Sequence, residues 1–349
     1  MRVLAVAYAC NPRQGSEEGV GWGWVNAIAA NHRVDVVTAA FHRPDIEYGL
    51  AEGAEKLADV RFHYVAEKPW HYRPSHPWKY IENGVLKPIM NLAYAAWQRD
   101  AYRLASQLDT QIGFDLVHLI TYVGFRFPGR FWKLDLPLVW GPIGGLENTP
   151  VRFLPLMGAY GCTYYACRNL VNALQRRWLP GPRRAMAKAA RTQSIIAATE
   201  GIRREIDRWY GHPSEVICEI GPPSTIAETH TLRQPDERLR LVWNGQHLPG
   251  KALPLLLKAL AGIDGVVDYE LTVLGAGPCS RKWQRLAGEL GIGGKCRWPG
   301  WIRRDEAIRV MGQAHVSVIT SLKDLTSTVL LESLAAGLPV VCPDHCGFS

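Results

Sequence analysis

The sequence predicts an α/β protein with two doubly wound lobes. Patterns typical of buried strands alternate with amphipathic helical patterns, as in parallel sheets covered by helices. The chain has 349 residues, enough for two domains, and 47% of them are hydrophobic, enough to fill two cores. The expected hinge is a polar, proline-containing segment near residues 221–237. We therefore place an N-terminal domain at residues 1–230 and a C-terminal domain at residues 236–349.

The N-terminal domain opens with a predicted strand over residues 1–9. Because this strand starts at the first residue, it leaves no room for a signal peptide and favours a cytoplasmic protein. A loop containing Gly15 follows, and Ser16 is placed to cap a helix. Apolar residues at spacing four support that helix: Val20, Trp24 and Ile28.

Three more strands are predicted in this domain, over residues 33–38, 114–122 and 138–148, the last running into a glycine loop. His118 lies near the C-terminal end of its strand. Open parallel sheets bind ligands at that edge, although a histidine at a strand end is more often a core or turn residue. His118 is therefore a candidate site residue with a structural alternative.

The C-terminal domain begins with a strand, a glycine turn and an amphipathic helix over residues 239–260, and the turn contains Gly245 and Lys251. A second buried strand ends at Gly275 and Gly277. A Gly-x-Gly after a strand is a weak nucleotide signal by itself, because the third glycine of the dinucleotide fingerprint is absent. Two more short strands follow, over residues 296–302 and 314–321.

The most informative pattern lies near the end of the chain, where Asp324 and Glu332 flank the start of a predicted helix over residues 326–336. A Thr/Ser cap opens this helix, Gly337 ends it, and residues 340–341 form a strand. Its core face is expected to hold Leu330, Leu331 and Leu334, with Thr328 and Glu332 on the opposite face. Glu332 is therefore expected outside the core, pointing toward the helix N-terminus.

That N-terminus suits an anion, because uncapped amides and the helix dipole favour phosphate there. The amides expected to bind it belong to Thr326, Ser327 and Thr328. Carboxylates beside them can accept hydrogen bonds from sugar hydroxyls. The implied ligand is a phosphate joined to sugars. The alternative is a surface helix whose acids only face solvent.

The stretch from Asp324 to Val341 resembles the donor motif of retaining GT-B glycosyltransferases of family 4, in which two Glu flank the nucleotide-sugar site. This resemblance covers residues 236–345 and implies two Rossmann-like lobes facing across a cleft. Asp324 replaces the first Glu and is shorter by one methylene. In the family a Gly-Arg pair and a later Lys hold the donor phosphates. Gly245 and Lys251 match, but Gln246 stands at the Arg position.

The resemblance therefore implies that Lys251 holds the phosphates alone or with help from His247, while a solvated lysine is the alternative. It also implies that the nucleotide lies over the Gly275 and Gly277 turn. In the N-terminal half it places Gly15 and Ser16 in a loop that faces the acceptor and the donor phosphate, and His118 beside the reacting sugar. Glu17 and Glu18 are either part of that loop's function or first-turn acids that stabilise the helix dipole.

The net charge of +8 is concentrated in residues 148–199, which contain no acid. Apolar and aromatic residues are interleaved with the cations, which predicts a surface for anionic lipid headgroups, to which residues 70–80 could add. No apolar run reaches 18 residues, so we expect peripheral binding. A nucleic-acid surface lacks a recognition motif, and an ordinary basic face remains an alternative. The cations are Arg152, Arg168, Arg176, Arg177, Arg183, Arg184, Lys188 and Arg191.

The eight cysteines are scattered without CxxC pairs and are expected to be reduced thiols. A zinc site at residues 342–346 would need a fourth ligand from elsewhere. The sequence has no Asp-x-Asp motif, so we expect metal-independent chemistry without a cofactor. The architecture normally adds several helices after the last strand, so the C-terminal domain is expected to be truncated.

Together these features predict a retaining glycosyltransferase that moves a sugar from a nucleotide diphosphate donor to a lipid-linked or polysaccharide acceptor. It is expected on the inner face of the membrane, without nucleic-acid partners. Two other classes remain open. One is a GT-B-like nucleotide-sugar epimerase or a phosphorylase, and the other is a non-catalytic membrane-associated scaffold.

Overall fold

The computed structural model describes residues 1–14, 16–51, 57, 59–67, 86–122, 124–221, 232–344 and 346–348. It divides into two compact units. The first comprises Met1–Glu147 and Asn172–Ile220, and the second comprises Asn148–Val171 and Gly221–Ser349. The expected hinge falls largely outside the described residues. The stretch 148–171, which was expected in the N-terminal domain, packs with the second unit.

The first unit is built on a seven-stranded sheet in the order β3-β2-β1-β4-β5-β6-β7, and every pairing is parallel. Its strands are β1 (Arg2–Val6), β2 (Arg33–Ala39), β3 (Val60–Val65), β4 (Leu116–Leu119), β5 (Leu138–Ile143), β6 (Ile195–Ala197) and β7 (Glu215–Val216). The order reverses after β1, because β2 and β4 pair on either side of it. The carboxyl ends of β1 and β4 therefore meet at the edge where such sheets bind ligands.

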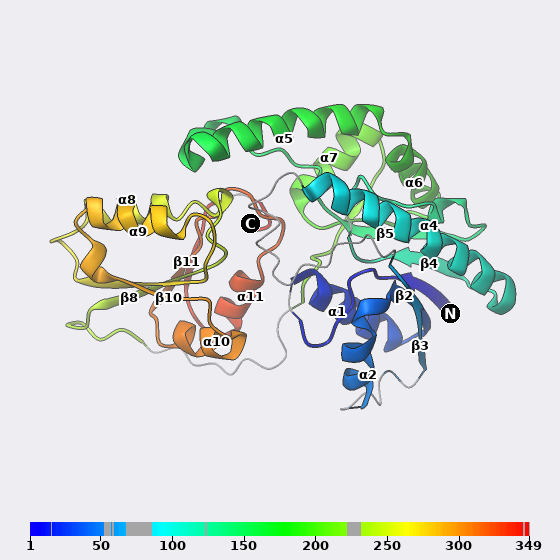
Figure 1. Cartoon of the computed structure of the whole chain (residues 1–349), viewed down its shortest axis with the longest axis horizontal. Helices are drawn as coiled ribbons and strands as arrows, with labels where there is room; N and C mark the ends of the chain where they lie inside the picture. Colours follow the sequence, from blue (N-terminus) through cyan, green and yellow to red (C-terminus); the bar gives the residue numbers. More distant parts are fainter. Residues whose placement is uncertain are drawn as a thin grey trace. The chain divides into compact units, whose positions relative to one another are not determined.

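Helices cover both faces of this sheet (Figure 1). They are α1 (Ser16–Ala29), α2 (Arg43–Ala51), α4 (Leu86–Ile112), α6 (Pro180–Ala190), α7 (Glu200–Tyr210) and the later part of α5 (Gly158–Trp178). One core cluster joins Val25 of α1 to Ala5 and Val36 of the central strands. Trp24 and Ile28 pack against the same cluster, so the predicted spacing of four does mark the buried face of α1.

The second unit has a five-stranded parallel sheet in the order β10-β9-β8-β11-β12. Its strands are β8 (Leu239–Asn244), β9 (Tyr269–Leu274), β10 (Cys296–Gly300), β11 (Val316–Val318) and β12 (Val340–Val341). Its helices are α8 (Pro254–Gly262), α9 (Ser280–Glu289), α10 (Arg304–Gly312), α11 (Thr328–Ala335) and the first part of α5, which follows a 3-10 turn over Val151–Met157.

Two cores lie on opposite faces of this second sheet (Figure 1). On one face Leu257 of α8 and Trp283 of α9 pack against Leu271 and other strand residues. On the other face Met311 of α10 packs against Val242 and Leu274. The unit is thus doubly wound, as the alternating pattern predicted. Because the sheet is parallel, the loops that follow β8, β9 and β11 lie at one edge and hold the predicted site residues.

Candidate functional site

Lys251 and Asp324 form an ion pair at this edge of the second sheet. Lys251 ends a 3-10 turn over Pro249–Lys251 after β8, and Asp324 lies in the loop between β11 and α11. The two loops are also joined through the backbone. Leu322 N donates to Gly250 O at 2.8 Å, and Thr320 Oγ1 donates to Lys251 O at 2.7 Å. Two residues that the motif placed at the donor phosphates and sugar are therefore held side by side, with both side chains partly buried.

Helix α11 begins at Thr328, two residues later than predicted, and Ser327 is its N-cap. Ser327 Oγ accepts a hydrogen bond from Leu330 N at 3.3 Å, so the cap uses one of the first-turn amides. Thr326 and Ser327 precede the helix. The predicted anion site used the amides of residues 326–328. Because the helix begins at Thr328, only the last of these three amides belongs to α11.

The predicted core face of α11 is wrong. Leu334 is 55% exposed, whereas Glu332, Ser333 and Ala336 are buried. The cause is the small side chain of Ser333, whose Oγ donates to Ser317 Oγ of β11 at 3.0 Å. A close approach of helix and strand through serines leaves no room for leucine on that face.

Glu332 was expected outside the core, but its side chain is only 7% exposed. Its Oε1 accepts a hydrogen bond from Arg304 Nε at 2.7 Å in an ion pair. Arg304 starts α10, 28 positions earlier, and no sequence signal linked the two residues. Within the described residues the second oxygen, Oε2, makes no hydrogen bond. The carboxylate is therefore fixed by an arginine and keeps an acceptor for a ligand.

The glycines after β8 and β9 allow two loops to touch through their backbones. Gly275 has φ of +101°, and a Cβ there would lie 2.0 Å from Gly245 O. A Cβ on Gly277 would lie 2.8 Å from His247 O. The amide of His247 donates to Ala276 O at 3.0 Å. The Gly-x-Gly pattern thus has a packing role, whether or not a nucleotide lies over it.

His247, the possible helper of Lys251, has a different environment from that lysine. Its ring is buried against Trp243 and Trp283, and its Nδ1 lies 2.8 Å from Ser280 Oγ. Burial lowers the pKa of His247 to about 4, so the ring is neutral at pH 7. Lys251 is left as the cation that the motif supplies.

Sequence reasoning also missed Tyr165. The stretch 148–171 was interpreted as a basic surface, but its apolar residues pack on the loops of the donor motif. Met157 and Tyr165 contact a cluster formed with Ala252 and Leu322. A Cβ on Gly250 would lie 2.5 Å from Tyr165 Oη. Burial raises the pKa of Tyr165 to about 12, and the charge of Asp324 adds to this shift. Tyr165 is therefore a neutral hydroxyl near the Lys251 and Asp324 pair.

In the first unit, His118 is buried on β4 and its Nε2 lies 3.0 Å from Gly141 O. Burial lowers the pKa of His118 to about 4, so the ring is neutral at pH 7. Because a carbonyl only accepts, Nε2 carries the proton and Nδ1 is left as an acceptor. Trp24 meets the ring edge-on, with 5.5 Å between centroids. A buried position near the end of a strand fits His118 both as a site residue and as a core residue.

Helix α1 begins at Ser16, and Gly15 lies outside the described residues. Glu17 does more than favour the helix dipole, because its Oε1 accepts a hydrogen bond from Tyr122 N at 2.6 Å. Tyr122 follows β4 and has a left-handed backbone, with φ of 56°. Glu17 thus ties the start of α1 to the loop that follows the His118 strand.

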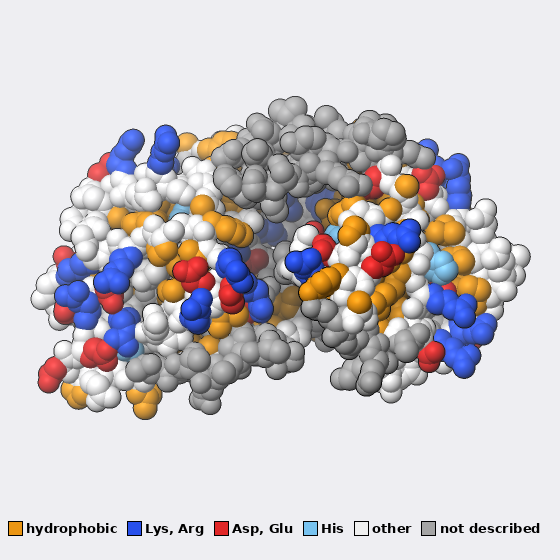
Figure 2. All heavy atoms as spheres, turned by 60° about the horizontal axis from the view of Figure 1, so that its bottom comes forward, with side chains coloured by type: hydrophobic (Ala, Val, Ile, Leu, Met, Phe, Trp, Pro, Cys, Tyr) orange, Lys and Arg blue, Asp and Glu red, His pale blue; other side chains and the backbone are white. Residues whose placement is uncertain are grey.

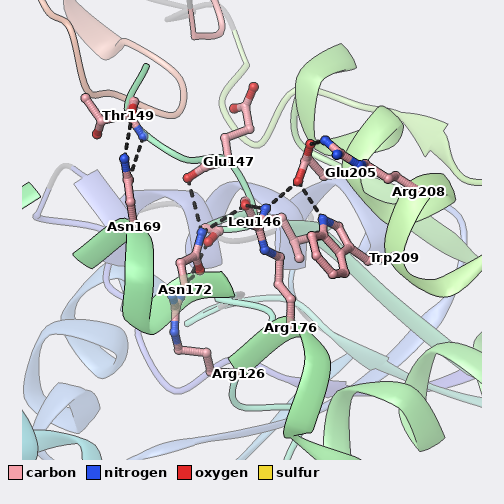
Figure 3. Close-up of polar contacts among 11 residues, drawn as sticks. Arg126, Leu146, Glu147, Thr149, Asn169, Asn172, Arg176, Glu205, Arg208 and Trp209 are labelled. Carbon is pink, nitrogen blue, oxygen red and sulfur yellow. Dashed lines mark hydrogen bonds and ion pairs between the residues drawn. The ribbon is translucent and has the colours of Figure 1, made fainter. Parts of the chain in front are cut away.

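A polar network joins α5 and α7 to the loop after β5 (Figure 3). Arg176 Nη1 donates to Leu146 O at 2.8 Å, and Asn172 Nδ2 donates to the same oxygen at 3.0 Å. Arg176 also pairs with Glu205 and lies over the Trp209 ring. Its side chain is only 3% exposed. Arg176 was expected on a lipid-facing surface, and this prediction is wrong because its charge is neutralised inside the first unit.

Among the described residues, no group of three or more His, Cys, Asp or Glu side chains is arranged to hold a metal ion. His345, one of the three possible ligands at residues 342–346, lies outside that part of the chain.

Comparison with known proteins agrees with this geometry. Residues 228–349 match the family model "Glycosyl transferases group 1". A curated relative, the lipopolysaccharide core biosynthesis glycosyltransferase LpsE of Rhizobium meliloti (strain 1021), is 33% identical over 153 residues. These residues are 43% of this chain and 44% of the relative, so the match spans less than half of either protein.

Solved structures extend the likeness to the whole chain. The lipopolysaccharide outer core galactosyltransferase WaaB in its apo form has a TM-score of 0.59 at 14% identity, covering 99% of this chain and 81% of that one. HepE of Anabaena in complex with UDP scores 0.59 at 15% identity, with 99% and 82% covered. A sucrose-phosphate synthase of Thermosynechococcus elongatus scores 0.62 at 15% identity, with 100% and 82% covered. The chain has the α/β fold of GT-B proteins.

Proposed function

We propose that this protein is a retaining glycosyltransferase that moves a sugar from a nucleotide diphosphate donor to a lipid-linked or polysaccharide acceptor. The observation that carries the proposal is the convergence of Lys251, Asp324 and the N-terminus of α11 at one edge of the second sheet. Lys251 would supply a cation, Asp324 an acceptor for hydrogen bonds from sugar hydroxyls, and α11 free amides. The match of residues 228–349 to a glycosyltransferase family and the LpsE relative support the same reaction class.

In sugar transfer the leaving diphosphate gains negative charge while the anomeric carbon becomes cationic. Lys251 and the first amides of α11 would stabilise the diphosphate. The ammonium of Lys251 has three N–H donors, so it can keep its bond to Asp324 and still donate to a phosphate oxygen. Asp324 in turn holds the ammonium in place and offers its remaining lone pairs to sugar hydroxyls.

Glu332 would accept hydrogen bonds from the ribose hydroxyls through Oε2, while Arg304 holds the carboxylate through Oε1. His118 would orient the reacting sugar as a neutral ring with Nδ1 as acceptor. Gly15 and Ser16 are proposed on the acceptor side. Metal independence is proposed because the sequence has no Asp-x-Asp motif and Lys251 can neutralise the phosphates. Retention would follow from front-face attack assisted by the departing phosphate.

The decisive experiment combines binding with turnover. UDP is the first nucleotide to titrate by calorimetry, because HepE is described in complex with it; GDP and ADP complete the series. Labelled UDP-sugars are then incubated with lipopolysaccharide core oligosaccharides, with and without EDTA, and the anomeric configuration of the product is read by NMR. Saturable nucleotide binding and EDTA-insensitive transfer with retained configuration are expected. Absence of nucleotide binding across the series would contradict the proposal.

We also propose that helix α5 rests on an anionic membrane surface. It exposes apolar side chains at helical spacing, and Trp178 is 71% exposed. Three exposed cations follow in the chain, Arg177 in the last turn of α5 and Arg183 and Arg184 in α6. On the face of the second unit visible in Figure 2, by contrast, acidic and basic side chains are intermixed. Within the described residues no helix is both long and apolar enough to cross a bilayer. The other exposed apolar residues of the stripe are Leu170, Val171 and Leu174.

Vesicle co-sedimentation tests this contact. Replacing Arg177, Arg183 and Arg184 together with Gln should release the protein from phosphatidylglycerol vesicles, since each cation near the surface contributes about 1 kcal/mol. Phosphatidylcholine vesicles should not bind either protein. The matched control removes three exposed cations of α9: Arg281, Lys282 and Arg285. Equal release by both triple variants would show a general charge effect and exclude α5 as the contact.

A further inference from the structure

A cavity of about 310 Å³ lies within the first unit, outside the donor motif. It is bounded by α4, by the loop after β4 and by the start of α6. Among the described residues that line it, three are arginines and none is acidic. The lining residues are Ala95, Gln98, Arg99, Arg126, Phe127, Pro128, Gly129, Arg130, Leu179, Gly181 and Pro182.

Two of these cations carry charge that the described part of the chain does not neutralise. Arg99 and Arg130 are exposed, and neither forms an ion pair with a described carboxylate. Arg126 is positioned differently. Its Nε donates to Gln175 Oε1 and its Nη2 donates to Asn172 Oδ1, both of them neutral amide oxygens (Figure 3 shows the bond to Asn172). The Arg126 guanidinium is thus held at the cavity wall by these two amide oxygens.

The N-terminus of α6 adds positive electrostatic potential that favours an anion in the cavity. This helix of 11 residues has no acid in its first turn, so its positive dipole end is not neutralised by a side chain there. Pro180 and Pro182 have no N–H, and Gly181 between them lines the cavity. A phosphate in the cavity would therefore meet the exposed guanidiniums of Arg99 and Arg130 beside a helix N-terminus.

We propose that this cavity, named here the Arg99–Arg126–Arg130 pocket, binds the phosphate monoester of the acceptor. Guanidinium groups match phosphate oxygens in paired hydrogen bonds, which favours a phosphate over a neutral sugar. The volume is at the lower end for small-molecule sites and holds a phosphate with part of the attached body. Phe127, Pro128 and Leu179 provide an apolar wall for that body. The acceptor role rests on the proposed glycosyltransferase function, but phosphate binding does not.

The test uses the full chain and two sources of the same group. Glucose 6-phosphate, inorganic phosphate and glucose are titrated by calorimetry for the soluble source. Vesicles of phosphatidic acid in phosphatidylcholine are used for the lipid headgroup. The variant is R99Q/R130Q, since both residues are exposed and should be dispensable for folding. The control is R103Q, which removes an exposed arginine of the same helix, one turn away from Arg99.

We expect saturable glucose 6-phosphate or phosphatidic acid binding that weakens at least tenfold in R99Q/R130Q and less than twofold in R103Q. Whichever probe shows this difference identifies the source. No saturable binding of either probe, or equal weakening in both variants, would overturn the proposal. UDP titrated into the same proteins reports separately on the donor motif, so failure of the proposed enzymatic function can be recognised independently.

Discussion

Lys251 and Asp324 are 73 positions apart and form an ion pair between the loops that follow β8 and β11. Both departures from the motif, Asp324 in place of Glu and Gln246 in place of Arg, therefore concern the charges around Lys251. With Gln246 in that place, Lys251 is the remaining motif cation, and Asp324 is near enough to orient it. The proposed donor site thus combines one cation, Lys251, with the carboxylate that holds it.

Asp324→Asn should separate the sugar contact from the nucleotide contact. Losing a hydrogen bond to a charged acceptor costs about 1.5–3 kcal/mol, so affinity for the intact UDP-sugar should fall at least tenfold. Affinity for UDP should change less than threefold, because Lys251 remains and the amide oxygen of the variant can still accept its hydrogen bond. Isothermal titration of both ligands checks this. The control is Asp264→Asn, which breaks the half-exposed pair with Lys295 in the same unit. A parallel loss for UDP and the UDP-sugar would contradict the role of Asp324.

Glu332→Ala should weaken UDP binding by about 2 kcal/mol if Oε2 accepts from the ribose. Arg304→Ala tests the support for that carboxylate. Without Arg304 the buried carboxylate of Glu332 loses the hydrogen bond that fixes it, so UDP affinity should fall in this variant as well. Calorimetry with UDP measures both losses. Unchanged nucleotide affinity in Glu332→Ala would exclude the ribose contact.

Arg176→Ala should destabilise the protein by about 3–5 kcal/mol, because it leaves Glu205 without its buried partner and removes one of the two donors to Leu146 O. Arg177→Ala, which removes the adjacent exposed cation, should cost less than about 0.5 kcal/mol. Urea unfolding followed by tryptophan fluorescence gives both values. Similar stabilities for the two variants would contradict the structural role of Arg176.

Gly275→Ala should destabilise the second unit by at least about 2 kcal/mol, because the added Cβ would overlap Gly245 O and the residue has a positive φ. Gly288→Ala is the matched comparison. It lies in α9, where a Cβ would meet nothing within 4 Å, and should stabilise by about 0.5–1 kcal/mol. Thermal unfolding of both variants checks the difference, and equal melting temperatures would show that the two loops can separate at no cost.

His118 should make stability depend on pH. Its folded pKa of about 4 lies below the unfolded value near 6.5, so the unfolded chain takes up the proton first as the pH falls. The contribution of His118 is fully present above pH 6.5 and is lost between pH 6.5 and 4, by up to about 3 kcal/mol. His118→Gln cannot take up this proton and should flatten the profile in that window. The free energy of unfolding in urea is measured for both proteins from pH 6.5 to pH 4. The same pH dependence in parent and variant would show that the pKa of His118 is not lowered.

The sequence predicted the repeating strands and helices well, because a parallel sheet needs buried strand residues at regular intervals. It also pointed to Lys251 and Asp324, which the structure brings together in one ion pair, while their role in donor binding stays a prediction. It could not identify Arg304, because an ion pair between two helices leaves no periodic trace. The face of α11 was mistaken because leucines usually indicate the core, whereas here a serine contact between Ser333 and Ser317 decides the packing. Charge counting misjudged Arg176 for a similar reason, as its partner lies 29 positions away.

The polypeptide passes from one unit to the other after Glu147, Val171 and Ile220, so neither unit is one continuous piece of chain. A recombinant fragment that starts at Gly221 would lack Met157 and Tyr165, which pack against Ala252 and Leu322. It would leave apolar surface bare beside the Lys251 loop. The second unit can therefore complete its fold only when residues 148–171 join residues that come much later in the chain. A fragment of residues 221–349 expressed alone should be insoluble, and co-expression of residues 148–171 should make it soluble.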